Sequence, residues 1–228
     1  MLYVIGDLHL SLSVAKPMDI FGGWDNYVER LQEGFSVVKE DDLTVICGDM
    51  TWGMNLEQCK LDFEFIDRLP GKKIILKGNH DYWWSTATKA KKFFAENGIE
   101  SIDILHNNCF FYNDIAICGT RGWFYEEETH GEHDKKVMNR ELMRLEASLK
   151  AAGDCRTKYC FLHYPPRYND YICDEVVELL EKYNVQRCYY GHIHGPGRRF
   201  AIEGNVGGVL YTMVSADHVG FKPVLAAE

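Results

Sequence analysis

Short apolar runs alternate with amphipathic segments through roughly the first hundred residues of the chain. The apolar runs cover residues 2–5, 43–47 and 73–77, and each is short enough for a buried strand. Apolar side chains then recur at helical spacing in three segments, at 25–39, 55–69 and 85–97. Three strand–helix units in series predict a parallel, doubly wound sheet.

The second half of the chain has shorter and more closely spaced runs. Strands are predicted at 102–106, 109–112 and 115–118, and the turn residues that join them are typical of a more antiparallel sheet. Helices are then predicted at 135–152 and 173–183, and strands at 159–162, 187–190, 199–203 and 208–214. The last two strands are expected to complete a second sheet.

Polar residues of metal-binding type follow five of the apolar runs. They are Asp7 and His9, Asp49, Asn79 and His80, His163, and His192 and His194. Because sites in open α/β sheets form outside the carboxyl ends of the strands, we expect these residues to converge in space. Carboxylates, an amide oxygen and several imidazoles suit Mn, Fe or Zn better than Ca or Mg alone.

This ordered set of motifs resembles the calcineurin-like metallophosphoesterase family. The family's D-x-H, G-D, G-N-H-D, H and G-H-x-H pattern is met by Asp7-Leu8-His9, Gly48-Asp49, Gly78-Asn79-His80-Asp81, His163 and Gly191-His192-Ile193-His194. The resemblance implies an α/β fold, a four-layer α/β/β/α sandwich of two mixed sheets flanked by helices. It also implies hydrolysis of a phosphate ester by a hydroxide that two metal ions hold for in-line attack.

The resemblance further implies a role for each residue of these motifs. The first ion would be held by Asp7, His9 and His194, the second by Asn79, His163 and His192, and Asp49 would bridge both. His80 would lie near the leaving group, where it would protonate the departing oxygen or stabilise charge on the phosphoryl group. Asp81 would orient His80 by hydrogen bonding, and an N-cap role in the next helix is the alternative.

Several neighbouring features have two interpretations. Arg121 follows the 115–118 strand, where it would bind phosphate bidentately beside Asn79 and His80, or form a surface salt bridge. The aromatic run 82–84 would form a wall for a ring-shaped ligand, or pack in the core. We expect one domain, residues 1–228, with the loop and helix at 122–152 as a candidate partial lid over the site.

Charge and cysteine usage narrow the class of protein. The formal charge of −9 disfavours a nucleic-acid binder, although nucleic acid remains an alternative substrate. The eight cysteines form no CxxC pair, which predicts reduced thiols and a cytoplasmic protein. No apolar stretch approaches the about 18 residues of a membrane span, so no membrane partner is expected. The sequence does not indicate an oligomeric state.

The sequence therefore predicts a binuclear phosphohydrolase with two divalent metal ions, manganese first and iron or zinc next. A small phosphate monoester or nucleotide is the first choice of substrate, and a phosphodiesterase or nuclease activity is the alternative. A binding scaffold with an inactive site is the alternative of another class. Met50-Thr51-Trp52 follow Asp49 in place of the Asp-Arg of the serine/threonine phosphatase branch, which argues against protein phosphatase activity.

Overall fold

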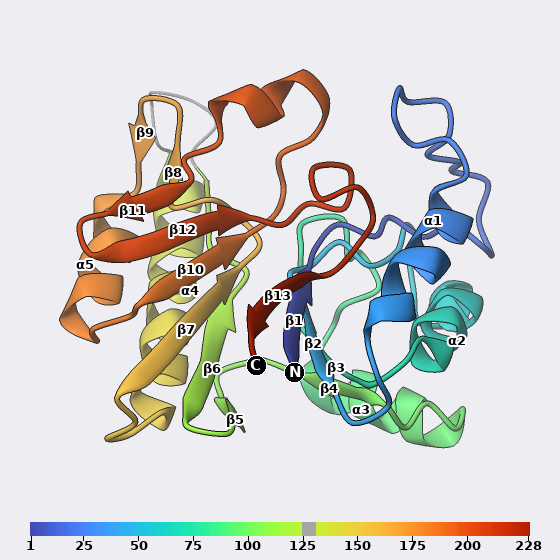
Figure 1. Ribbon diagram of the computed structural model, residues 1–228, viewed down its shortest axis with the longest axis horizontal. Coiled ribbons are helices and arrows are strands. Elements are labelled where there is room, and N and C mark those ends of the chain that lie inside the picture. Colours follow the sequence, from blue (N-terminus) through green and yellow to red (C-terminus); the bar gives the residue numbers. More distant parts are fainter. Residues whose placement is uncertain (125–130) are drawn as a thin grey trace.

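The computed structural model describes residues 1–124 and 131–228. Two large mixed sheets lie face to face, and helices cover the outer face of each one (Figure 1). The four-layer sandwich expected from the family resemblance is thus confirmed. Among the described residues, no helix is long and apolar enough to cross a membrane.

The first sheet has the strand order β13-β1-β2-β3-β4. Its strands are β1 (Leu2–Ile5), β2 (Leu43–Ile46), β3 (Lys72–Ile75), β4 (Ile102–Ile104) and β13 (Val224–Ala227). The first four run parallel, and β13 pairs antiparallel with β1 at the edge. Three helices cover the outer face of this sheet, α1 (Tyr27–Gly34), α2 (Lys60–Arg68) and α3 (Ala87–Glu96).

The second sheet has the strand order β11-β12-β10-β7-β6-β5. Its strands are β5 (Phe110–Tyr112), β6 (Ile115–Thr120), β7 (Thr157–Leu162), β10 (Arg187–Tyr190), β11 (Gly204–Val206) and β12 (Val209–Met213). Helices α4 (Glu132–Ala151) and α5 (Asp174–Lys182) cover its outer face. A small hairpin of β8 (Arg167–Tyr168) and β9 (Tyr171–Ile172) stands beside the sheet (Figure 1).

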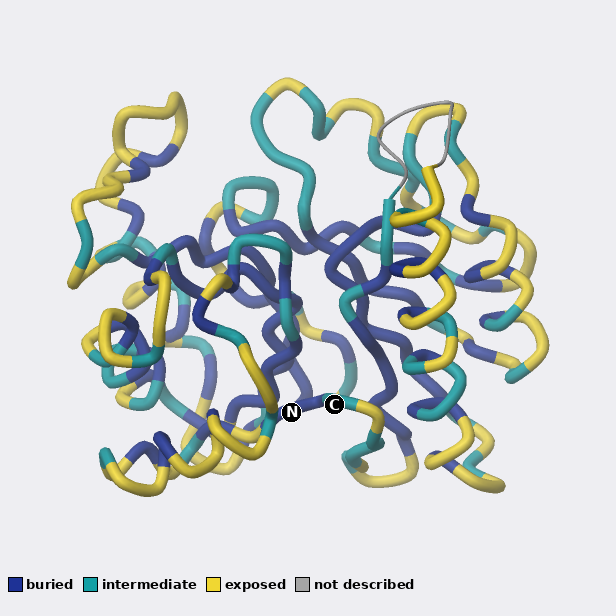
Figure 2. Tube along the Cα trace, turned by 180° about the vertical axis from the view of Figure 1, so that it is seen from behind, coloured by how far each residue is buried: buried dark blue, intermediate teal, exposed yellow. Residues whose placement is uncertain are grey.

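Alternation of side chains along each strand builds three apolar layers. In β1, Tyr3 and Ile5 face the helices, whereas Leu2 and Val4 face the second sheet. The strands of the second sheet divide their side chains in the same way between α4 and α5 and the space between the sheets. Both faces of each sheet are therefore buried, and the exposed residues gather on the outer helices and loops (Figure 2).

This layering corrects two predictions made from the strand pattern. The first sheet is not doubly wound, because only one of its faces carries helices and the other packs on the second sheet. The second sheet is less antiparallel than expected, since β6, β7, β10 and β12 run parallel and only its two edge pairs are antiparallel. The predicted strand at 102–106 belongs to the first sheet, as β4.

The segment that follows β10 also differs from its prediction. Residues Gly195–Phe200 form a 3₁₀ helix with Pro196 in its first turn, and the strand expected at 199–203 begins only at Gly204. Helix α4 packs Met138, Leu145 and Leu149 on the second sheet, so this part of the 122–152 segment is an outer layer of the sandwich. Residues 125–130, in the loop of the 122–152 segment, lie outside the described part of the chain.

Candidate metal centre

Backbone and side-chain hydrogen bonds hold together the loops that follow the strands. The His9 N–H donates to the Asp49 carbonyl at 2.9 Å, and the Gly191 N–H donates to the His163 carbonyl at 3.1 Å. Between the two sheets, His163 Nδ1 lies 3.0 Å from the Cys47 carbonyl at the end of β2. The predicted ligands of both sheets are thereby brought to one edge of the sandwich.

The first cluster contains Asp7, His9 and His194. One ligand atom of each lies within 4.8 Å of the others. The Nε2 atoms of His9 and His194 are 3.2 Å apart, and His194 Nε2 is 3.5 Å from Asp7 Oδ1. Two imidazole nitrogens and a carboxylate that face one point form a donor set suited to a divalent cation.

The second cluster is built around the amide oxygen of Asn79. Asn79 Oδ1 lies 2.5 Å from His163 Nε2 and 2.9 Å from His192 Nδ1. The Asp49 carboxylate lies between the two clusters, 3.5 Å from His163 Nε2 and 3.7 Å from His9 Nε2. Asp49 is also within 4.8 Å of both Asp7 and His163. The two clusters are therefore continuous, as a bridged pair of ions requires.

Four of these residues have left-handed backbone conformations, which is uncommon for residues with a Cβ atom. The φ angles are 57° for Asp7, 47° for His9, 52° for Asp49 and 73° for His192. Such strain persists only where surrounding structure enforces it, and it is concentrated at functional sites. The sequence motifs gave no indication of these conformations.

Glycine allows two of the loops to pass close to the carboxylates. A Cβ atom on Gly78 would overlap the Asp49 carboxylate, and one on Gly191 would overlap the Asp7 carboxylate. Glycine at position 78 thus allows the backbone to approach the site closely. Substitution of either glycine would displace a candidate ligand.

Burial and neighbouring groups give the imidazoles different proton affinities. Burial lowers the pKa of His163 to about 4 and that of His192 to about 3, so both rings are neutral at pH 7. Burial also disfavours the charged form of His194, but hydrogen bonds to Asp217 and Asp7 outweigh it and raise its pKa to about 10. Neutral His163 and His192 are the forms that bind metal ions.

The Asp49 carboxylate is buried beside other carboxylates that disfavour its negative charge. Burial, followed by the charges of Asp81 and Asp7, raises the pKa of Asp49 well above its usual range. Asp7 and Asp49 are 0% and 1% exposed. A cation between these carboxylates would remove the repulsion and favour their ionised forms. The donor set and its charge therefore fit a divalent metal centre.

Asp81 has partners different from the one expected. Its carboxylate accepts hydrogen bonds from the backbone N–H groups of Gly78, Asp49 and Met50 at 2.7, 2.9 and 3.0 Å, and from Trp83 Nε1 at 3.0 Å. These bonds fix the two metal-binding loops to each other. The expected N-cap role needs correction, because α3 begins six residues later, at residue 87, with another N-cap.

His80 is oriented by other groups. Its backbone N–H donates to Asp49 Oδ1 at 2.7 Å, and its Nδ1 pairs with the Tyr82 hydroxyl at 3.0 Å. The ring lies against Trp52, with 4.4 Å between the ring centroids. His80 is thus held beside the first cluster without a hydrogen bond from Asp81 among the described contacts.

Asp217 is a site residue that the sequence motifs did not indicate. Its Oδ1 lies 2.9 Å from His194 Nδ1, and its Oδ2 accepts the Gly195 N–H at 3.0 Å. Such a carboxylate fixes the orientation and tautomer of a metal-binding imidazole. Asp217 follows the strand β12 closely, so its place after an apolar run was the one signal available.

Arg121 and Trp83, which lies in the aromatic run 82–84, both pack against other side chains. Arg121 Nη2 lies 3.4 Å from Glu141 Oε1, and its guanidinium stacks on Trp123 at 4.9 Å. Trp83 is 3% exposed and packs edge-on against Phe63, so core packing is confirmed for this residue of the run. A different set of aromatic residues lies beside the metal centre.

A cavity of about 720 Å³ lies beside the metal centre, and we call it the aromatic pocket. Its walls include Met18, Phe21, Trp24 and Trp52 together with His9, His80 and His194 of the site. Trp52 stacks on His9, with ring centroids 5.0 Å apart and an interplanar angle of 24°. An apolar group held here would lie next to His80 and the first cluster.

Two solved structures have a similar fold. Phosphopantetheinyl hydrolase (PptH) from Mycobacterium tuberculosis aligns with a TM-score of 0.59 at 14% identity, over 99% of this chain and 96% of that one. The protein of unknown function AQ665 from Aquifex aeolicus aligns with a TM-score of 0.50 at 17% identity, over 98% of this chain and 94% of that one. No curated protein matches the chain significantly.

The sequence itself matches a family model. The model of the calcineurin-like phosphoesterases covers residues 1–196, which include both clusters and most of the chain. The structural neighbours agree with this match at the level of the fold. The chain therefore belongs to the calcineurin-like phosphoesterase family and is a phosphoric ester hydrolase that works with divalent metal ions.

Proposed function

We propose that the protein hydrolyses a small phosphate monoester at a binuclear metal centre. In this proposal Asp7, His9 and His194 hold one ion, Asn79, His163 and His192 hold the other, and Asp49 bridges them. The observation that carries it is the continuity of the two clusters through Asp49, which lies within 4 Å of an imidazole nitrogen of each. When bound, a pair of divalent ions lowers the pKa of water and neutralises phosphoryl charge.

The residues of the chain would then position the ester. His80 and Asn79 flank the centre, and the His80 ring would donate an N–H to an ester or phosphoryl oxygen. Trp52 and Tyr82 hold that ring in place, by the tilted ring contact and the hydrogen bond already described. Loss of His80 should therefore affect turnover more than metal binding.

The aromatic pocket supports a ring-bearing leaving group, such as a nucleoside. It adjoins His80, and its volume of about 720 Å³ is within the usual range for small-molecule sites. Tryptophan and methionine walls favour a flat apolar group over a strongly hydrated one. A nucleotide monoester is therefore preferred to a sugar phosphate.

Turnover of two synthetic esters would test the proposal. Nitrophenyl phosphate and bis-nitrophenyl phosphate are compared in the presence of Mn²⁺, with metal content measured on the same samples. We expect the monoester to be the better substrate, and Asp49→Asn to lose turnover while the exposed Asp103→Asn variant keeps it. A preference for the diester would reverse the substrate class, and no turnover by a fully metallated sample would favour a binding scaffold.

Two finer assignments accompany this function. We propose manganese as the first choice of metal, with iron or zinc next, because the site combines carboxylate, amide and imidazole donors. We also propose a cytoplasmic location, because all eight cysteines are free thiols and six of them are buried. Retention of Mn²⁺ against a competing series of divalent ions would test the first assignment.

A further inference from the structure

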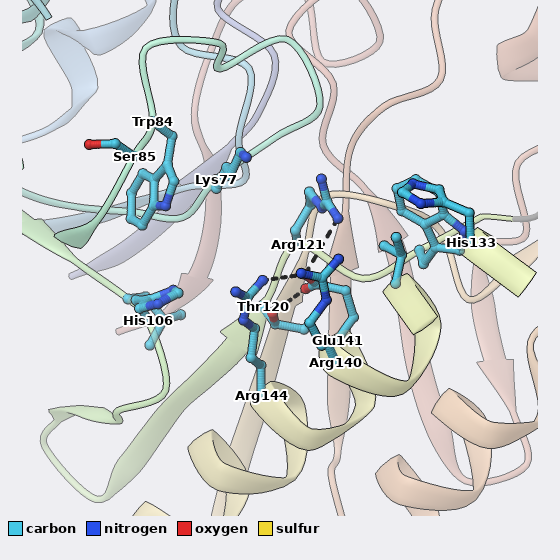
Figure 3. Close-up of a pocket in the computed structure, with 13 residues that line it drawn as sticks. Lys77, Trp84, Ser85, His106, Thr120, Arg121, His133, Arg140, Glu141 and Arg144 are labelled. Atoms are coloured by element: carbon cyan, nitrogen blue, oxygen red, sulfur yellow. Dashed lines mark hydrogen bonds and ion pairs between the residues drawn. The ribbon is translucent and has the colours of Figure 1, made fainter. Parts of the chain in front are cut away.

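A second cavity lies between α4 and the metal-binding loops (Figure 3). It has a volume of about 350 Å³, and its walls come from the loops after β3 and β6 and from α4 (Figure 3). Four cationic residues line it, Lys77, Arg121, Arg140 and Arg144, together with Glu141. We call this cavity the basic pocket.

The basic pocket holds more positive charge than its own carboxylate neutralises. Glu141 is 2% exposed and already accepts hydrogen bonds from Arg144 at 2.6 Å, from the Thr120 hydroxyl at 2.7 Å and from Arg121 at 3.4 Å. Among the described lining residues, four cationic groups face this single carboxylate. In a chain with a formal charge of −9, such a local excess indicates an anionic ligand.

The walls also contain hydrogen-bond donors that the protein does not use. Arg121 Nε and Trp123 Nε1 are buried and have no partner among the described residues. Opposite them, His106 lies against Trp84 with ring centroids 5.3 Å apart. Burial, followed by the charge of Arg144, lowers the pKa of His106, which agrees with a positive field in the pocket. An anion with several oxygen atoms would meet these donors.

Two loops that follow strands connect the basic pocket to the metal centre. Lys77 precedes the candidate ligand Asn79 by two residues, a span of roughly 7 Å in extended chain. The Arg121 carbonyl accepts the His163 N–H at 3.1 Å, so the loop that carries Arg121 is bonded directly to a second candidate ligand. Arg121 and Lys77 thus lie between α4 and the metal-binding loops. The basic pocket and the metal centre are therefore neighbours along these two loops.

We propose that the basic pocket binds a phosphate dianion, and that in the substrate this is a second phosphate group on the same molecule as the scissile ester. The first part rests on the pocket alone, and the second part rests also on the proposed function. The substrate class would then be a bisphosphorylated small molecule, with one phosphate at the metal centre and the other between α4 and Lys77.

Binding of inorganic sulfate tests the first part. Sulfate has the shape and charge of the phosphate dianion and is titrated calorimetrically into the full chain at constant ionic strength. Arg140→Gln changes an exposed wall residue, and Arg144→Gln removes a partner of Glu141; each should weaken binding roughly tenfold, the usual value of a charged hydrogen bond. Arg156→Gln, an exposed arginine outside the pocket, is the matched control and should bind like the wild type.

A matched substrate pair tests the second part. The kcat/KM of a nucleoside bisphosphate is divided by that of the corresponding nucleoside monophosphate, for the wild type and each variant. We expect the wild-type ratio to exceed one, Arg140→Gln to lower it roughly tenfold, and Arg156→Gln to preserve it. Because Arg140 is exposed and makes no described contact with Glu141, this variant keeps the test valid if Arg144→Gln fails to fold.

The outcomes separate the two parts and the proposed function. Equal sulfate binding by Arg140→Gln and Arg156→Gln, or no binding by the wild type, would overturn the basic pocket as an anion site. Weaker sulfate binding with an unmoved substrate ratio would overturn the second part and show that the anion is a separate molecule. Failure to hydrolyse any ester would overturn the proposed function and the second part, while the sulfate titration would still decide the first part.

Discussion

At the scale of single residues, the imidazoles of the site differ in whether they must lose a proton before they bind a metal ion. His163 and His192 are neutral at pH 7, because burial lowers their pKa to about 4 and about 3. His194 is the exception, since Asp217 and Asp7 offset its burial and raise its pKa to about 10. A metal ion that binds His194 at neutral pH must therefore displace a proton.

This difference predicts how metal affinity varies with pH. Between pH 5 and pH 10, the His194 ring of the metal-free site is protonated, whereas the His163 and His192 rings are neutral. The apparent affinity should rise at least about tenfold per pH unit between pH 6 and 9, because His194 releases one proton for each ion bound there and the raised pKa of Asp49 can only add to the slope. Titration of Mn²⁺ against a chelator of known affinity, repeated across this range, would measure the slope.

The Asp217→Asn variant is the control for that slope. Asparagine keeps an oxygen near His194 Nδ1 but removes the charge that raises the pKa of His194. Its affinity for Mn²⁺ should vary less steeply with pH than that of the wild type. An equal slope in both proteins would mean that Asp217 does not set the proton affinity of His194.

Two adjacent residues of the G-N-H-D motif should have separable effects. Asn79→Ala removes the amide oxygen shared by His163 and His192, so we expect it to lower the occupancy of one ion. His80→Ala should leave both ions bound and reduce kcat by about 10²- to 10⁴-fold, the range for loss of a general acid or base. Metal analysis and turnover of each variant would show the division, and an equal fall in metal content would contradict it.

The residues most accessible to sequence reasoning were those with distinctive chemistry at strand ends. His163 and His192 belong to different sequence motifs, yet each lies within two residues of the end of an apolar strand, and parallel strands bring their ends together. Asp217 carries no such distinctive motif, because a lone aspartate after a strand is common in loops. Left-handed conformations at Asp7 and His9 depend on contacts with distant loops, so local sequence could not reveal them.

At the scale of elements, Lys73 joins the end of α2 to the start of β3. The side chain is 1% exposed, and its ammonium donates to the carbonyls of Leu69, Gly71 and Asp67 at 2.5, 2.7 and 3.1 Å. These carbonyls lie in the turn that ends α2 and have no helical partner of their own. A cation at the C-terminal end of a helix also interacts favourably with the helix dipole.

Lys73→Met should therefore destabilise the protein although the residue lies far from the site. Methionine fills a similar volume but leaves the carbonyls of Leu69 and Gly71 without the Lys73 donor, which costs about 3 kcal/mol in the free energy of unfolding. Urea denaturation followed by circular dichroism would measure the change. Lys72→Met, at the exposed neighbouring position, should shift the free energy by less than about 0.5 kcal/mol. Equal effects would mean that the hydrogen bonds of Lys73 contribute little.

Strands with an apolar run of their own were predictable, and those without one were not. Apolar runs located β1, β2 and β10 to within one residue, because a strand buried on both faces is almost wholly apolar. The hairpin β8–β9 has two residues per strand, too few to show a period. The edge strand β13 is set by its pairing with β1 at the other end of the chain, which no local pattern reports.

At the scale of the whole molecule, the metal centre joins the two sheets. Asp7, Asp49 and Asn79 follow strands of the first sheet, whereas His163, His192 and His194 follow strands of the second. An apolar layer that includes Val4, Val45, Phe161 and Tyr189 lies between the sheets beneath these residues. We propose that residues 1–228 act as one domain, because the apolar layer and the metal centre both connect its halves.

Metal ions bound at this junction should stabilise the folded protein as a whole. An ion present at about 100 times its Kd adds about 2.7 kcal/mol, which corresponds to roughly 5–10 °C in Tm for a chain of this size. Calorimetric scans in Mn²⁺ and in a chelator would measure the difference. The same Tm in both conditions would contradict a metal centre shared between the sheets.

The Asp49→Asn substitution should change the Tm in opposite directions in the absence and in the presence of metal. Without metal, Asp49 is a buried carboxylate close to Asp7 and Asp81, and its neutralisation should raise the Tm above that of the wild type. With Mn²⁺, the wild type should become the more stable protein, since the variant lacks the carboxylate between the two ions. Asp103→Asn, at an exposed position of β4, should follow the wild type in both conditions. A lower Tm for Asp49→Asn in the chelator would mean that the carboxylate stabilises the fold even without metal.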